Sequence, residues 1–139
     1  MATAEDHAAA SRIATATGEL LLDLRQRLFA LGADTWTVRD SGDMEAHEFI
    51  MGELTAQFPD DGILSEEGRD DLGRLQKHRV WIVDPLDGTR EFSERGRSDW
   101  AVHIALAEGG VPTAGAVALP AMGTTLGTDP VPKLAPAHE

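Results

Sequence analysis

The sequence predicts an α+β fold in which two helices pack on a mainly antiparallel sheet. Two observations lead to this prediction. In the first 58 residues, apolar side chains recur every three or four positions, which is typical of amphipathic helices. From residue 62 onward the apolar segments are short and separated by turn-forming residues, which favours strands. With 139 residues, of which 42% are hydrophobic, the chain is long enough to bury the core of one ordinary domain.

The first predicted helix carries Ile13 and a series of leucines up to Leu31, spaced by three or four residues. Gly32 is expected to end it, because glycine readily adopts the left-handed conformation found just after a helix. A short extended piece, TWTV at residues 35–38, is expected to connect this helix to the next.

The second predicted helix covers residues 43–58, with Asp43 at its N-cap and Pro59 just beyond its end. One apolar residue stands at every fourth position of this segment. These residues are Ala46, Ile50, Leu54 and Phe58. Their spacing places them on one face, which is therefore expected to be buried against the sheet.

The rest of the chain is predicted to form strands, with one helical stretch at 70–77 between the first two. The third strand alternates in character, so that one face carries Trp100, Val102, Ile104 and Leu106. Gly109 and Gly110 then turn the chain into a hairpin. Trp81 and Trp100 are expected in the core. The predicted strands are 62–65, 79–83, 99–106, 111–120 and 123–128.

The composition excludes several classes of function. The chain has 12 basic and 24 acidic residues and a formal net charge of −12, so a nucleic-acid polymer or an anionic membrane surface would be repelled. The absence of cysteine excludes disulfides and thiolate metal sites. No signal sequence or membrane-spanning run is recognised. A soluble, cytoplasmic protein is expected.

The stretch WIVDPLDGTREF, residues 81–92, carries the strongest chemical signal. A buried apolar run ends in Asp84 and Asp87, and ionised carboxylates beside a buried strand are costly unless a positive charge compensates them. Both carboxylates are expected to point into one concave spot. Mg²⁺ is commonly held by one or two carboxylates together with phosphate oxygens. The stretch therefore predicts a divalent-cation site.

Two neighbouring features fit a cation bound together with a phosphate. Gly88 and Thr89 are expected to start a short helix at 89–93, whose first N–H groups would bind an anion. Glu66, in the acidic segment LSEEGRDD, follows the predicted strand 62–65 and would lie beside Asp84 if strands 62–65 and 79–83 are neighbours.

Each of these features alone has a simpler explanation. An isolated D-P-x-D is most often a turn, an acidic segment is most often a solvated loop, and Asp43 alone is most often a helix cap. The five histidines show no spacing typical of metal ligands and receive no chemical role. His103, on the small-residue face of its strand, is expected to be a satisfied core or surface group.

The order and spacing of these motifs resemble the Mg²⁺-dependent, lithium-sensitive inositol monophosphatase superfamily. WIVDPLDGTREF is similar to its D-P-[IL]-D-G-T-x-x-F signature, and LSEEGRDD lies where the family has G-E-E, with Ser65 in place of the glycine. Asp43 lies where the family's V-T-x-A-D segment ends. The ending T-R-E-F resembles the T-K-E-F found in the branch of the family that hydrolyses adenosine 3',5'-bisphosphate (PAP). The resemblance covers nearly the whole chain and implies the N-terminal half of the inositol monophosphatase-like fold.

The resemblance implies a role for each matched residue. Glu66, Asp84 and the carbonyl of Leu86 would hold a first Mg²⁺ or Mn²⁺, and Asp84 and Asp87 would bridge to a second. Thr89, hydrogen-bonded to Asp43, would orient or deprotonate the attacking water. The amides of Gly88 and Thr89 would bind the phosphate. The implied catalytic set is Asp43, Glu66 and Thr89.

The implied activity is metal-dependent hydrolysis of a small phosphomonoester, with removal of the 3'-phosphate of PAP as the leading reaction. The alternatives are an inositol monophosphatase or a short form that binds metal and phosphate without turnover. Residues 1–128 would form the metal- and phosphate-binding domain and 129–139 a proline-rich tail. The second domain of the family, with its W-D-x-A motif, is absent from the sequence. A chain cut at this junction is expected to self-associate through the uncharged segment 111–120.

Overall fold

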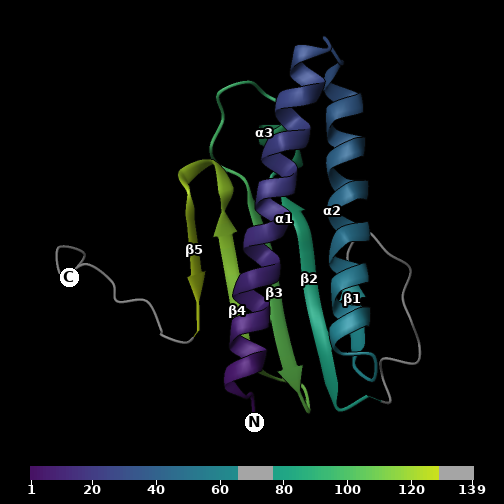
Figure 1. Cartoon of the computed structure of the whole chain (residues 1–139), viewed down its shortest axis with the longest axis vertical. Coiled ribbons are helices and arrows are strands. Elements are labelled where there is room, and N and C mark those ends of the chain that lie inside the picture. Colours follow the sequence, from purple (N-terminus) through teal and green to yellow (C-terminus); the bar gives the residue numbers. More distant parts are fainter. Residues whose placement is uncertain (66–76, 129–139) are drawn as a thin grey trace, which may run out of the picture.

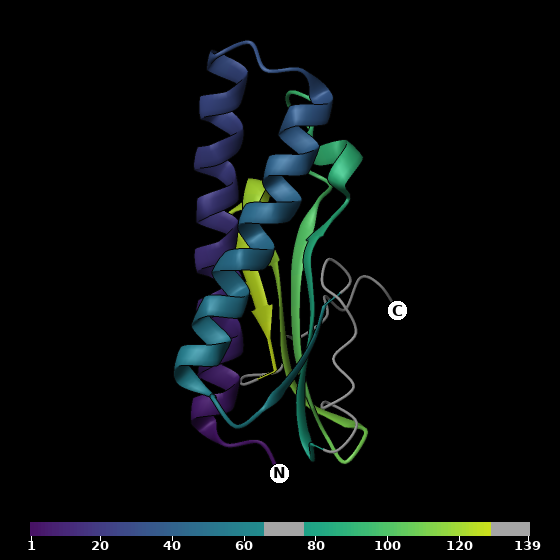
Figure 2. The same cartoon turned by 90° about the vertical axis from the view of Figure 1, so that its right-hand side faces the viewer.

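The computed structural model of the chain describes residues 1–65 and 77–128. Two long helices, α1 (Ala4–Ala30) and α2 (Thr35–Gln57), lie on one face of a five-stranded sheet (Figures 1 and 2). α1 packs against the middle and far strands of the sheet, and α2 packs against the first two strands. This arrangement confirms the predicted α+β class, with two helices on a mainly antiparallel sheet.

The strands follow one another across the sheet in the order in which they occur in the chain. β1 and β2 are parallel, and every later pair is antiparallel. A single turn of helix, α3 (Thr89–Phe92), follows β2, and a 3-10 turn at Pro120–Met122 precedes β5. The strands are β1 (Gly62–Ser65), β2 (Arg79–Asp87), β3 (Ala101–Glu108), β4 (Val111–Leu119) and β5 (Thr124–Gly127).

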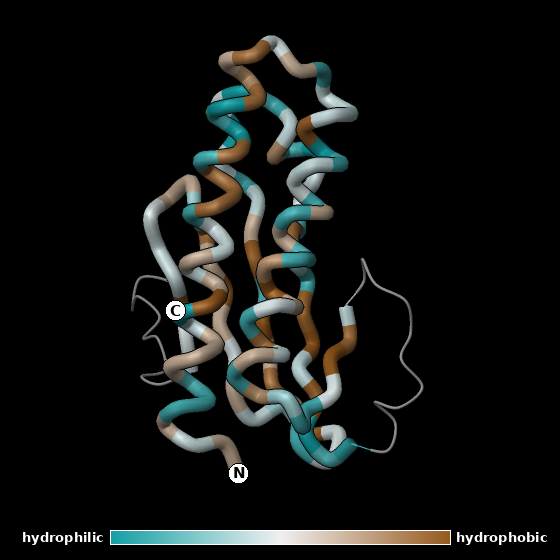
Figure 3. Tube along the Cα trace, turned by 45° about the vertical axis from the view of Figure 1, so that its right-hand side comes forward, coloured by the Kyte–Doolittle hydropathy of each residue, from teal (hydrophilic) through white to brown (hydrophobic). Residues whose placement is uncertain are grey.

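The core lies between the helices and the sheet. Figure 3 shows the hydrophobic colour along the central strands and alternating with polar residues along the helices. Trp81 and Trp100 are fully buried, as predicted, and the ring of Phe92 packs edge-on against Trp100 with 4.9 Å between centroids. The predicted inward face of β3 is also confirmed, because Val102, Ile104 and Leu106 are all buried.

The start of α2 corrects two predictions. The segment 35–38 is the first turn of the helix rather than an extended piece, and Asp43 lies well inside the helix rather than at its N-cap. The N-cap is Asp34, whose carboxylate accepts a hydrogen bond of 2.8 Å from the Thr37 amide. Val38 begins the buried stripe about two turns earlier than expected, so tertiary packing outweighs the low helix propensity of TWTV.

Other boundaries differ less. α1 starts at Ala4 behind a capping box formed by Thr3 and Asp6, because its alanine-rich first turns need no large apolar residues to be helical. Gly32 adopts φ of +74° just past the end of α1, as predicted. β2 continues to Asp87 instead of ending at residue 83. The predicted helix 70–77 lies almost wholly outside the described residues.

The sheet covers only part of the segment 111–120, through which self-association is expected. β4 pairs with β3 along most of its length but with β5 only over residues 116–119, so only this part of β4 is paired on both sides. Within the described residues, the strands at the two ends of the sheet are β1 and β5. No helix in this part of the chain is long and apolar enough to cross a bilayer.

A cluster of charged side chains closes the sheet where β2 begins. Arg79 donates hydrogen bonds to the carboxylates of Asp6, on α1, and Asp61, just before β1, at 2.8 to 3.1 Å. It also approaches Glu108 of β3 at 3.4 Å. The indole N–H of Trp81 donates to Asp61 at 2.9 Å. One guanidinium thus joins the first helix, the loop before β1 and two strands.

Candidate metal and phosphate site

Asp84 and Asp87 are brought together by an irregularity in β2. In the β2–β3 ladder, Asp84 pairs with His103 and Asp87 with Ala101, so β2 advances three residues while β3 advances two. Residues three apart in a regular strand point to opposite faces. The extra residue, a β-bulge, turns Leu86 into the core and lets Asp87 project outward, as Asp84 does. The bulge therefore makes both carboxylates available to one ion.

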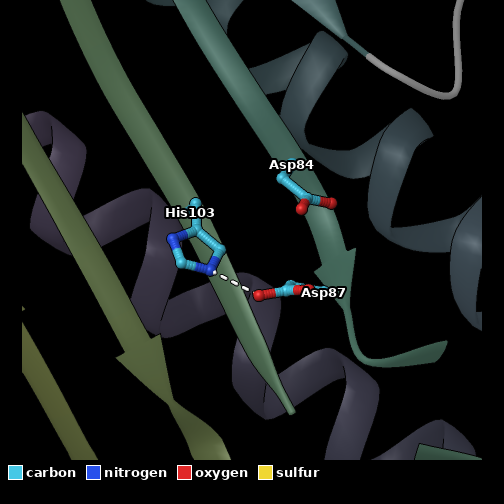
Figure 4. A group of neighbouring side chains, drawn as sticks. All are labelled: Asp84, Asp87 and His103. Atoms are coloured by element: carbon cyan, nitrogen blue, oxygen red, sulfur yellow. Dashed lines mark hydrogen bonds and ion pairs between the residues drawn. The ribbon is translucent and has the colours of Figure 1, made fainter. Parts of the chain in front are cut away.

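His103 completes this group from the neighbouring strand. It lies between the buried residues Val102 and Ile104, so its side chain projects from the face of the sheet opposite the helices. Its Nε2 atom is 3.0 Å from Oδ2 of Asp87 (Figure 4). One potential ligand atom from each of Asp84, Asp87 and His103 lies within 4.8 Å of the others. Two carboxylates and an imidazole at this separation are a suitable donor set for a divalent cation.

The sequence reasoning missed His103. It assigned no chemistry to any histidine, because the chain shows no regular histidine spacing. The informative signal is the antiparallel register, which sets His103 directly opposite Asp84. That register depends on where the chain turns between β2 and β3, which local patterns do not reveal.

Asp43 and Thr89 form a second element of the site. The Thr89 hydroxyl donates to Oδ1 of Asp43 at 3.0 Å and lies 3.3 Å from the carbonyl oxygen of Leu86. This is the Asp43 to Thr89 hydrogen bond that the resemblance implied. Gly42 allows it, because a Cβ atom there would lie 2.6 Å from the ring of Phe92. The missing side chain lets α2 approach α3 closely enough for the two residues to meet.

The environment of Asp43 raises the pKa of its carboxyl. Burial raises the pKa of this carboxyl above its usual value, and the nearby Asp40 raises it further, while the hydrogen bond from Thr89 lowers it. A carboxylate with a raised pKa, bonded to a hydroxyl, is suited to accept a proton.

The turn from β2 into α3 requires glycine. Gly88 has φ of +84°, in the left-handed region, and a Cβ atom would lie 3.0 Å from the carbonyl oxygen of Asp99. The first N–H groups of any helix have no acceptor within the helix. Gly88 is the N-cap of α3 and Thr89 its first residue, and their role in phosphate binding stays a prediction.

A cavity of about 290 Å³ opens next to these groups. It lies beside the end of β2 and the neighbouring parts of β3 and β4. Its lining residues are Asp87, Gly88, Asp99, Trp100, Ala101, His103, Val117 and Leu119. Its lining combines apolar side chains with the polar groups of Asp87, Asp99 and His103, a combination that is typical of small-molecule sites.

Of the two remaining predicted metal ligands, one lies within the described residues and the other does not. The carbonyl of Leu86 faces the Thr89 hydroxyl, and its side chain is buried. Glu66 lies outside the described residues, so its position beside Asp84 stays a prediction. The condition on which it depended is met, because β1 and β2 are parallel neighbours with Ser65 opposite Val83.

Comparison with known proteins agrees with these observations. A model of the inositol monophosphatase family matches residues 37–129. A 3'-phosphoadenosine 5'-phosphate phosphatase of Mycobacterium leprae is 52% identical over 128 residues, which cover 85% of this chain and 46% of that protein. The 3'(2'),5'-bisphosphate nucleotidase CysQ of Escherichia coli is 44% identical over 85 residues, or 59% of this chain and 33% of that protein. The chain spans less than half the length of these curated relatives.

Solved structures show the same fold. CysQ from Bacteroides thetaiotaomicron superposes with a TM-score of 0.68 at 34% identity, covering 84% of this chain and 42% of that one. Inositol monophosphatase II from Staphylococcus aureus gives a TM-score of 0.78 at 22% identity, covering 90% and 46%. At this lower identity the likeness shows the fold alone.

Proposed function

The chain belongs to the inositol monophosphatase family, and on this premise we propose that it forms the metal- and phosphate-binding part of a phosphatase that hydrolyses phosphomonoesters. The family is metal-dependent. The observation that carries the proposal is the bulge that directs Asp84 and Asp87 to one side, next to the Asp43 to Thr89 hydrogen bond. This combination supplies groups for a cation and a proton acceptor in one place.

We propose PAP as the substrate. The M. leprae relative, with 52% identity, is named as a phosphatase of this compound, and the ending T-R-E-F of the motif points to the same branch. Inositol phosphates are the second candidate substrate, because the matching family model is that of inositol monophosphatases. A short form that binds metal and phosphate without turnover is the alternative function.

Asp84, Glu66 and the carbonyl of Leu86 would hold one Mg²⁺ or Mn²⁺, and Asp84 with Asp87 would contact a second. Bound there, the ions would supply positive charge for the phosphate and lower the pKa of a water molecule. This charge is needed because the chain itself carries a net charge of −12 and would repel an anionic substrate.

The residues of the chain would then position the reactants. The Thr89 hydroxyl donates its proton to the hydrogen bond with Asp43, so its oxygen would be free to orient the attacking water. Asp43, with its raised pKa, would accept the proton. The amides of Gly88 and Thr89 would bind the phosphate oxygens at the start of α3. The cavity beside Asp87 would take part of the rest of the substrate.

We further propose that residues 1–128 form one functional unit with 129–139 as a tail, and that the protein acts in the cytoplasm. Self-association also stays a prediction, and exposed apolar side chains of the sheet support it. Ile82 and Leu126 are each 43% exposed and Val111 is 60% exposed. Size exclusion at increasing salt concentration would measure it, since screening weakens the repulsion between highly acidic chains.

The proposed function is tested by measuring release of inorganic phosphate from PAP and from inositol 1-phosphate, with Mg²⁺ and with a chelator. We expect Mg²⁺-dependent release from PAP that is lost in Asp84→Asn. The matched control is Asp23→Asn, which removes a carboxylate from an exposed pair with Arg27 on α1. The M. leprae relative serves as the positive control for the assay. Binding of Mg²⁺ without release from either compound would favour the alternative, a non-catalytic form.

A further inference from the structure

We propose that His103 is a metal ligand, so that Asp84, Asp87 and His103 form a mixed oxygen and nitrogen site that favours Mn²⁺ and Co²⁺ over Mg²⁺. The inference rests on the proposed metal dependence and goes beyond it. It adds a ligand from β3 and names the class of ion that this ligand selects.

The spacing of the donor atoms supports ligation. Ligands about 2.1 Å from an ion and at right angles to each other are about 3.0 Å apart. Nε2 of His103 and Oδ2 of Asp87 are separated by 3.0 Å, and donor atoms of all three residues lie within 4.8 Å of one another. One ion can therefore contact the three residues without a large movement of the backbone.

The backbone fixes this geometry. His103 and Asp84 are register partners on adjacent antiparallel strands, and the bulge sets Asp87 beside them. Groups on paired strands are held more rigidly than groups on loops. All three ligands come from residues 84–103, so this site uses no residue from the undescribed segments. The three side chains are partly exposed, and Asp87 and His103 also line the cavity at the end of β2.

The chemistry of imidazole decides which ion is favoured. Mg²⁺ prefers oxygen donors and holds its water molecules tightly. First-row transition ions bind sites with a nitrogen donor with affinities that rise along the Irving–Williams series, from manganese, the weakest, to cobalt and beyond. A site with one nitrogen among its protein ligands is therefore expected to discriminate between the two groups of ions.

The same 3.0 Å contact has a second interpretation, in which His103 only donates a hydrogen bond to Asp87 and orients its carboxylate. In that case His103 is a positioning residue. Its removal would then lower the affinity for Mg²⁺, Mn²⁺ and Co²⁺ by similar factors, because the ligand oxygen is the same for each ion. The two roles thus differ in metal selectivity.

Calorimetric titration of the 139-residue chain with each ion alone distinguishes a ligand role of His103 from a positioning role. We expect His103→Ala to reduce the affinity for Co²⁺ and Mn²⁺ by roughly tenfold or more, and the affinity for Mg²⁺ by less than about threefold. The control is His7→Ala, since His7 contacts Thr128 at the N-terminal end of α1. An equal loss for all three ions would overturn ligation and leave only the positioning role.

A spectroscopic measurement tests ligation without relying on the variant's stability. Pulsed electron paramagnetic resonance of the wild-type chain with bound Mn²⁺ should show coupling to a coordinated nitrogen nucleus. His103→Gln keeps a polar side chain that can donate to Asp87 but lacks the imidazole, and the nitrogen coupling should disappear. Absence of the coupling in the wild-type chain would refute the proposal.

These measurements use no substrate. Failure of the chain to release phosphate from PAP would therefore leave the role of His103 intact. Conversely, absence of nitrogen coupling would leave the proposed phosphatase function intact, because Asp84 and Asp87 would still supply oxygen ligands.

Discussion

The two ends of β2 both gather carboxylates, but they compensate them in different ways. At its start, the carboxylates of Asp6 and Asp61 accept hydrogen bonds from Arg79. At its end, Asp87 contacts His103, and among the described residues it has no arginine or lysine partner. The first cluster contains its own cation, and the second combines two carboxylates with an imidazole, a donor set that suits a metal ion. The comparison separates a cluster that stabilises the fold from one arranged for binding.

The pKa values of carboxyl groups in the two regions are shifted in opposite directions. Hydrogen bonding to Arg79 lowers the pKa of Asp6 to about 2. Burial raises the pKa of Asp43, whose described partner is the hydroxyl of Thr89. An acid beside an arginine is held in its charged form, while an acid buried beside a hydroxyl is more easily protonated. The first suits a structural pair and the second suits proton transfer.

Removing the cation of the structural cluster should have the largest effect. Arg79→Ala removes the guanidinium that Asp6, Asp61 and Glu108 share, and their side chains are only 4%, 9% and 7% exposed. We expect the free energy of unfolding in urea to fall by about 3–5 kcal/mol. Arg27→Ala, at an exposed pair on α1, should cost about 0.3–0.5 kcal/mol or less. Equal losses in the two variants would contradict the comparison.

In the cluster of Asp84, Asp87 and His103, substitutions should lower metal affinity strongly but change the free energy of unfolding little. Asp84→Asn is expected to lower Mg²⁺ affinity by more than about 100-fold, because even groups outside the ligand set typically contribute about 10–100-fold. Calorimetry measures this loss. Asp87→Asn provides the stability comparison, since the exposed Asp87 to His103 pair should contribute no more than about 1 kcal/mol to unfolding. A loss as large as that of Arg79→Ala would show that both clusters are structural.

Thr89→Ala should separate catalysis from binding within the site. The hydroxyl contacts Asp43 and the Leu86 carbonyl but is not assigned as a ligand. We expect phosphate release to fall by about 100-fold, the lower end of general acid–base effects, with Mg²⁺ affinity nearly unchanged. Release assays and titrations on the same preparation would measure both. A parallel fall in affinity would show that Thr89 holds the metal site together.

A smaller but measurable effect is expected on how the free energy of unfolding depends on pH. The folded-state pKa of Asp6 lies below its ordinary value of 3.8, so this carboxylate stabilises the fold above pH 4 and loses that contribution as pH falls toward 2. The shift corresponds to about 2 kcal/mol. Asp6→Asn should therefore flatten the urea-unfolding profile between pH 4 and 2. A profile of unchanged slope would contradict the role of the Asp6 pair.

Asp43→Asn should increase the free energy of unfolding at neutral pH. The folded-state pKa of Asp43 is raised, so its ionised form opposes folding at neutral pH and this effect is relieved as pH falls. Without metal, the Asn variant should therefore be more stable than the wild-type chain at pH 7. Urea unfolding at pH 7 in a chelator measures the difference. Destabilisation would indicate that the bond from Thr89 outweighs the cost of burial.

Local patterns predicted much of the fold. The central strand, the glycine hairpin and the buried face of β3 all follow from alternation and turn residues, which act over a few positions. The segment 35–38 was predicted wrongly because its β-branched and aromatic residues disfavour a helix locally, whereas Asp34 caps it and Val38 is buried by tertiary packing. Propensity was a weaker factor there than capping and burial.

The site was predictable only as far as motifs extend. Asp84, Asp87, Gly88 and Thr89 stand in one continuous stretch, so their proximity could be inferred. His103 joins them through strand register, which the sequence does not display locally. The Arg79 cluster was not anticipated for the same reason, since it joins residues from four separate parts of the chain.

The bulge in β2 makes the site depend on the number of residues as well as on their identity. A point substitution at Pro85 changes a side chain but leaves the count between Asp84 and Asp87 unchanged. An insertion of one residue opposite the bulge, between Ala101 and His103 of β3, would restore a regular ladder and turn Asp87 to the opposite face, toward the core. The convergence of the two carboxylates thus depends on the difference in residue count between the two strands, which a substitution leaves unchanged and such an insertion removes.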